Sequence, residues 1–185
     1  MPATDPAPLD RPPDPPAEDV RAAFRDLHGR RLHGFALLLT LGDRPTAARL
    51  ASEALATGTA RIGELRHPER AAAWLRRRVV EGARSVRGQR DDGHVLTALG
   101  ADESVITSIA GLGRLERAVL IASAIERLDR RDVAEIVGRD GSALDKLLRR
   151  ARERYLRAHA ATAPGEPPEG PIAAHVQRLA RRALT

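Results

Sequence analysis

The stretch that decides the fold is Arg131-Asp-Val-Ala-Glu-Ile-Val-Gly138-Arg-Asp-Gly-Ser-Ala-Leu144-Asp-Lys-Leu-Leu-Arg-Arg-Ala-Arg152. Its first part predicts a short helix, because Val133, Ile136 and Val137 recur at the spacing that forms one apolar stripe. Gly138 follows directly. Glycine suits the left-handed conformation that commonly ends a helix, so we expect the chain to turn at this residue.

A second helix is predicted after this turn, with Asp140 or Ser142 as its N-cap. The apolar side chains of this helix share one side, at spacings of three and four residues: Leu144, Leu147, Leu148 and Ala151. The remaining surface of this helix is formed by Ser142, Ala143, Asp145, Lys146, Arg149 and Arg150. Two short helices around a glycine turn are typical of a helix-turn-helix, whose second helix enters the DNA major groove, so these six residues are candidates for DNA contact. The alternative is an αα-hairpin that serves only packing.

Composition indicates helices throughout the chain. The 185 residues suffice for one domain or two small ones, and the aromatic residues are few (Trp74, Tyr155, Phe24 and Phe35). Ala, Leu, Arg and Glu dominate, whereas alternating β-branched residues are nearly absent, which favours helix over strand. The predicted fold is all-α, with two small helical domains, a three-helix bundle and a helix-turn-helix domain, joined by a short linker.

Residue types exclude several classes of function. The chain contains no cysteine, so disulfides, thiolate zinc sites and cysteine nucleophiles are excluded. The six histidines lack metal-ligand spacing, and nothing pairs a nucleophile with a base or builds a phosphate-binding glycine loop. We therefore expect no metal, no cofactor and no enzymatic activity. Neither a membrane span nor a signal peptide is recognisable, so we expect a cytoplasmic protein.

Changes in composition divide the chain into five segments. Residues 1–17 are rich in proline and predict a disordered tail. Residues 18–90 predict a helical domain, and residues 91–111, with scattered Gly, Asp, Ser and Thr, predict a linker. Residues 112–160 hold the helix-turn-helix domain. Residues 161–185 predict a linker and a short basic amphipathic helix, for docking on the protein itself or binding a partner or an anionic membrane surface.

Apolar periodicity and capping signals place the helices within these domains. The first is expected from Glu18 to Leu41, with Val20 and Leu27 among its core residues. The second is expected to start at Pro45 and to run to about residue 58, with Asp43 as its N-cap. A third follows residue 68, and a fourth spans residues 115–128.

The third helix has a basic face. It carries six arginines, namely Arg76, Arg77, Arg78, Arg84, Arg87 and Arg90, against only one acid within that span. A run of charges on a helix is commonly a solvated surface, whereas a phosphate-contacting face is the functional alternative. Under this second interpretation, DNA contacts are expected at Arg76, Arg77, Arg84 and Arg87. The net charge of +6 agrees with an anionic partner.

Several motifs resemble those of a known family. Leu112-Gly-Arg-Leu-Glu-Arg117-Ala-Val-Leu120 is similar to a Leu-Pro-x-x-x-Arg-x-x-Leu pattern, and Val133-Ala-Glu-Ile-Val-Gly138 to a Glu-Ile-Ala-x-x-Leu-Gly pattern. Leu148-Arg-Arg-Ala-Arg152 matches Leu-x-Arg-Ala-Arg, and Trp74-Leu75 is similar to the opening of a promoter-facing helix. With the order of the predicted elements, residues 20–158 resemble the extracytoplasmic-function (ECF) class of bacterial RNA polymerase sigma factors.

The resemblance implies a transcription initiation factor whose partners are promoter DNA and core RNA polymerase, and it admits an anti-sigma factor as a further partner. It places the polymerase contact at Arg49, Leu50 and Glu53, where the family usually has a more acidic motif. Since only Glu53 keeps an acid there, a second hypothesis stays open: a helix-turn-helix DNA-binding regulator, or degenerate sigma relative, that does not engage polymerase. A third is an interaction module without a DNA role.

Overall fold

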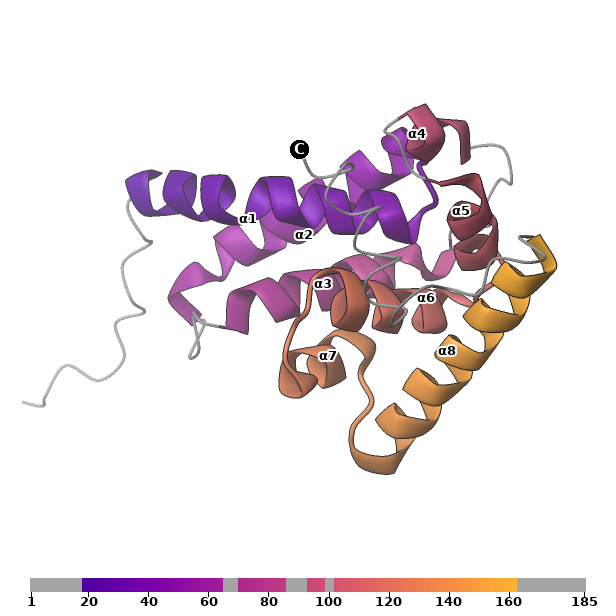
Figure 1. Ribbon diagram of the computed structural model, residues 1–185. Helices are drawn as coiled ribbons and strands as arrows, with labels where there is room; N and C mark the ends of the chain where they lie inside the picture. Colours follow the sequence, from indigo (N-terminus) through magenta and orange to yellow (C-terminus); the bar gives the residue numbers. More distant parts are fainter. Residues whose placement is uncertain (1–17, 65–69, 86–92, 99–101, 163–185) are drawn as a thin grey trace, which may run out of the picture.

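The computed structural model describes residues 18–64, 70–85, 93–98 and 102–162, which are helical and contain no strand (Figure 1). The predicted all-α class is confirmed. The helices are α1 (Glu18–Leu39), α2 (Arg44–Ala60), α3 (Ala71–Gly82), α4 (Gly93–Ala98), α5 (Glu103–Ala110), α6 (Arg114–Leu120), α7 (Arg130–Val137) and α8 (Gly141–Thr162). The predicted tail (1–17), the predicted carboxy-terminal helix and Arg87 lie outside the described residues.

Helices α1, α2 and α3 pack on one another. The Asp43 side chain accepts a hydrogen bond from the Thr46 backbone N–H at 2.9 Å, which confirms the expected N-cap of α2. A Cβ atom at Gly58 would lie 2.9 Å from the Leu75 side chain, so this glycine permits the close approach of α2 and α3. Val20 and Leu27, expected in the core, are instead 49% and 71% exposed.

The predicted linker 91–111 contains two helices. Helix α5 packs against α8, and its Val105, Ile106 and Ile109 side chains are buried. The Asp102 side chain caps α5 by accepting a hydrogen bond from Ser104 N–H. Because α5 buries its apolar side against α8, it belongs to the same half of the molecule as the helix-turn-helix.

The expected fourth helix begins close to its predicted start but changes its winding. It is α-helical to Leu120 and continues as a π-helical turn, Ile121–Ile125, in which the Glu126 N–H donates to the Ile121 carbonyl at 2.9 Å. Turns of this type are rare and are frequently found at functional sites. Here the turn ends the helix at Glu126, whose side chain reaches α3.

The two halves of the chain share one core. Buried side chains form a single cluster that extends from Phe24 in α1 to Tyr155 in α8. Helix α7 packs against α3, and Figure 1 shows it lying directly beneath that helix, with α8 along one side of the molecule. The expected separation into two domains is therefore not confirmed, because α3 buries one of its sides against the second half.

Candidate nucleic-acid interface

The turn between α7 and α8 has the geometry expected of a helix-turn-helix. The Asp129 side chain caps α7 by accepting a hydrogen bond from Asp132 N–H at 2.8 Å. Gly138 adopts the left-handed conformation, with φ 61° and ψ 40°. The Arg139 N–H then donates to the Ala134 carbonyl at 3.2 Å, which closes the turn at the end of α7.

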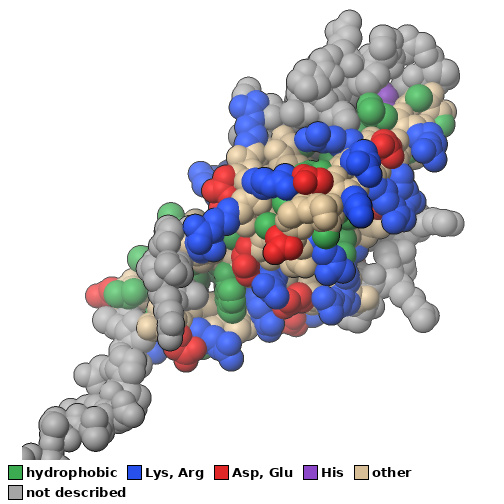
Figure 2. Space-filling model, turned by 90° about the horizontal axis from the view of Figure 1, so that it is seen from below, with side chains coloured by type: hydrophobic (Ala, Val, Ile, Leu, Met, Phe, Trp, Pro, Cys, Tyr) green, Lys and Arg blue, Asp and Glu red, His purple; other side chains and the backbone are tan. Residues whose placement is uncertain are grey.

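Helix α8 presents one face to solvent. Its 22 residues correspond to about 33 Å of helix, and Leu144, Ala151 and Tyr155 anchor its inner side. All six residues predicted to contact DNA are exposed, and they come from the first half of the helix: Ser142, Ala143, Asp145, Lys146, Arg149 and Arg150. Seen from below, Lys and Arg side chains cover much of the molecule, with carboxylates between them (Figure 2).

The cations of this face differ in how strongly they are already paired. Within the described residues, the Lys146 ammonium group has no ion-pair or hydrogen-bond partner. Arg149 lies 3.9 Å from the Glu153 carboxylate, a loose contact between exposed side chains. Arg150 instead makes a 2.8 Å ion pair with the buried Glu116 carboxylate of α6. Lys146 and Arg149 are therefore the more available groups for a phosphate or a base edge.

Glu116 organises the contact between α6 and α8. Its carboxylate accepts from the Gly113 N–H at 2.9 Å, which caps α6, and from Arg154 at 2.9 Å in addition to Arg150. A buried carboxylate with several charge-assisted hydrogen bonds is strongly held. Consequently, Arg150 serves the packing of α8 as well as its outer face.

The position of Arg76 differs from the one predicted from the sequence, which was an exposed contact with DNA. Its guanidinium donates to both carboxylate oxygens of Glu126 at 2.6 Å, and its side chain is only 6% exposed. It also donates to the Ala72 carbonyl. The expected DNA contact at Arg76 is unavailable in this structure, because the side chain lies between the two halves of the protein.

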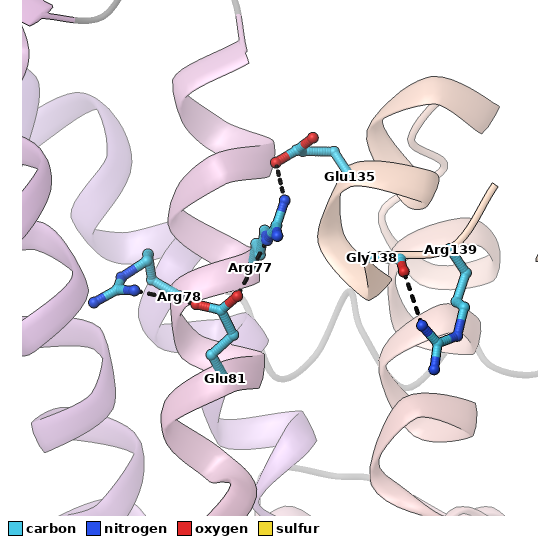
Figure 3. A network of polar contacts seen from close by, with 6 residues as sticks. All are labelled: Arg77, Arg78, Glu81, Glu135, Gly138 and Arg139. Atoms are coloured by element: carbon cyan, nitrogen blue, oxygen red, sulfur yellow. Dashed lines mark hydrogen bonds and ion pairs between the residues drawn. The ribbon is translucent and has the colours of Figure 1, made fainter.

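Arg77 is also occupied by carboxylates. It donates to Glu135 of α7 at 2.9 Å and to Glu81 of its own helix at 3.1 Å, as Figure 3 shows. Hydrogen bonds to Glu135 and then to Glu81 raise the pKa of Arg77 above its usual value. Arg78 shares the Glu81 carboxylate. Among the described arginines of the expected basic face, three are thus paired with carboxylates, whereas Arg84 is exposed.

Of the three residues expected to contact polymerase, one is buried and two are exposed. Leu50 is only 2% exposed, and its side chain fills the space beside Gly82, where a Cβ would lie 2.7 Å from it. The expected contact at Leu50 is thus corrected to a core position. Arg49 and Glu53 remain on the surface of α2, paired with each other at 2.9 Å.

Arg130 was not among the predicted site residues, yet it lies beside them. It starts α7 and reaches across the turn to Asp145 at 2.7 Å and to the Gly141 carbonyl at 3.3 Å. The turn between α7 and α8 brings Arg130 and Asp145 together, since they lie 15 positions apart in the sequence. The arginine pair Arg130 and Arg131 before the apolar stripe was the available sequence signal.

The remaining findings are negative. No helix in the described ranges has the length and apolar character needed to cross a membrane. The same residues hold no cluster of His, Asp or Glu side chains suited to a metal ion. No protein-family model matches the chain, and no curated protein matches it with statistical significance.

Proposed function

We propose that this protein is a cytoplasmic helix-turn-helix regulator that binds duplex DNA through the outward face of α8. One observation carries the proposal: the six side chains selected from the sequence are all exposed on α8, which follows a tight left-handed turn. Helix α3 is the less suitable DNA-binding face, since carboxylates already hold its Arg76 and Arg77 side chains.

The chemistry of this face fits a nucleic acid. Lys146 and Arg149 are exposed and can neutralise phosphates, which supplies much of the affinity of DNA-binding proteins and makes it salt-dependent. The same groups can donate to guanine edges in the major groove. The Ser142 and Ala143 side chains at the start of the helix are small and permit close approach of the backbone to the duplex.

The proposal is tested by titrating the full chain against duplex DNA at several salt concentrations. We expect affinity to fall steeply with salt, and Lys146→Ala with Arg149→Ala to weaken binding and reduce the salt slope by about two. The matched control removes two exposed arginines at the ends of α2, Arg44→Ala at its first residue with Arg61→Ala directly after its last. Equal losses for the two double variants would contradict the assignment of the α8 face.

A sigma-like initiation factor is the second candidate. It is favoured by Arg49 and Glu53, which are exposed on α2 where the family resemblance puts the polymerase contact. This function requires α3 to separate from the π-helical turn and from α7, because the Arg76 and Arg77 side chains are otherwise held by Glu126 and Glu135. A pull-down with core RNA polymerase tests it directly: retention favours the sigma-like function, and its absence alongside duplex binding favours the regulator.

A further inference from the structure

Asp145 stands out on the proposed DNA-binding face because it is an acid among cations. Its side chain is 57% exposed, close to the start of α8, and its Oδ1 accepts a 2.7 Å hydrogen bond from Arg130. Within the described residues its Oδ2 has no hydrogen-bond partner. A carboxylate next to phosphates is unfavourable, so its presence on such a face calls for a compensating contact.

Arg130 fixes the position of this carboxylate. Its Nη1 donates to Asp145, while its Nη2 donates to the Gly141 carbonyl at 3.3 Å, so one guanidinium holds both the start of α8 and the acid one turn later. The hydrogen bond from Arg130 lowers the pKa of Asp145, so the group remains an ionised acceptor. Arg130 also supplies a positive charge that partly offsets repulsion between Asp145 and DNA phosphates.

An ionised carboxylate can only accept hydrogen bonds, which limits the bases that it tolerates in the major groove. Guanine presents two acceptors there, thymine presents an acceptor and a methyl group, and adenine presents an acceptor beside its donor. Cytosine presents its N4 amino donor without an acceptor beside it. The chemistry of Asp145 therefore matches cytosine better than the other three bases.

We propose that Asp145 is a specificity-determining residue that accepts a hydrogen bond from the N4 amino group of a cytosine, and that Arg130 is its positioning residue. The inference rests on the proposed function, since it assigns one base contact within the α8 face. The alternative role for the pair is a surface ion pair that only secures the start of α8.

Selection of binding sites from a random duplex library by the full chain tests the inference. We expect one position of the selected site to be cytosine. Asp145→Asn keeps the size of the side chain but adds a donor, and asparagine pairs with adenine through two hydrogen bonds. The preference at that one position should shift from cytosine to adenine by roughly tenfold, with other positions unchanged. Selection of the same cytosine by Asp145→Asn overturns the inference.

Arg130→Gln and Arg131→Gln form the matched pair for the positioning role, since the two residues are adjacent and exposed. Arg130→Gln should flatten the cytosine preference, Arg130→Lys should restore part of it, and Arg131→Gln should leave base preference unaltered. If Arg130→Gln acts like Arg131→Gln, Arg130 is not a positioning residue. Absence of salt-dependent duplex binding by the unaltered protein defeats the proposed function itself, whereas Lys146-dependent binding with no cytosine preference defeats only this inference.

Discussion

Arg76 of α3 and Glu126 at the end of the π-helical turn form a bidentate ion pair across the two halves of the protein, with both N–O distances at 2.6 Å. Their side chains are 6% and 10% exposed. The pair lies beside the α3–α7 contact, where Arg77 and Glu135 form a second, more exposed pair. An arginine expected on an outer DNA-binding face is thus part of the internal structure.

Replacing one partner of this pair should destabilise the protein strongly. Glu126→Gln leaves the Arg76 charge buried without its counter-ion, and such a loss costs about 3–5 kcal/mol. Urea denaturation measures the free energy of unfolding. Glu53→Gln is the control, because it breaks the exposed Arg49–Glu53 pair and should cost no more than about 1 kcal/mol. Similar losses for the two variants would mean that the Arg76–Glu126 pair is solvated.

The turn of the helix-turn-helix should depend on glycine for backbone reasons alone. Gly138→Ala places a Cβ where no atom lies within 4 Å, but at a φ of +61°, which costs a non-glycine residue about 1–2 kcal/mol. Gly63→Ala is the matched control, since it also meets open space but has no positive φ. Thermal unfolding of both variants checks this. Equal stability of the two would show that the left-handed turn is not required.

Gly138 and Arg76 show which features of the fold can be predicted from the sequence and which cannot. Gly138 and the Asp43 cap were predictable because local backbone geometry demands those residue types. The placement of Arg76 was not, because its partner lies 50 positions further along the chain. Periodicity identified the polar side of α3, expected either to be solvated or to contact phosphates, but it could not reveal that α7 would cover part of it.

On the α8 face, too, the exposure of the side chains was predictable from the sequence, whereas their pairing was not. Its six residues were predicted correctly as exposed, because apolar spacing fixes which side of a helix is buried. The pairing of Arg150 with Glu116 and of Asp145 with Arg130 depends on how α8 crosses α6 and α7, which spacing does not encode. Leu50 was placed in the polymerase contact by family resemblance, whereas its own apolar character agrees with its burial.

Arg117 makes the free energy of unfolding depend on pH in the alkaline range. It donates to the Leu39 carbonyl at 2.6 Å and to the Leu112 carbonyl, and burial lowers its pKa to about 10. The unfolded chain has the higher, ordinary pKa, so above about pH 10 it binds more protons than the folded protein, and folding is favoured as the pH rises.

The comparison protein for this effect is Arg117→Met. The hydrogen bonds lost in this variant lower its free energy of unfolding by an amount that does not change with pH. The slope of the difference in unfolding free energy against pH therefore reports only the titration of Arg117. We expect the unfolding free energy of the unaltered protein to rise relative to that of the variant between about pH 10 and 11. Denaturation at a series of pH values checks this, and a flat difference would indicate that Arg117 is hydrated.

The two neighbouring arginines of α8 should contribute unequally to DNA binding. Arg149→Ala should reduce the salt slope by about one, as expected for loss of one phosphate contact. Arg150→Ala should reduce it less, because Arg150 already pairs with Glu116 at 2.8 Å and must leave that carboxylate to contact DNA. Fluorescence anisotropy at several salt concentrations measures both slopes. A larger effect of Arg150→Ala would reverse this ranking.

The most direct test of the central claim locates the duplex relative to α8. The chain has no cysteine, so Ser142→Cys and Ala48→Cys each give one attachment point for an iron chelate that cleaves nearby DNA. Both positions are exposed, the first on α8 and the second on α2. We predict discrete cleavage of bound duplex from position 142 and none from position 48. Cleavage from position 48 alone, or from neither position while DNA remains bound, would contradict binding through α8.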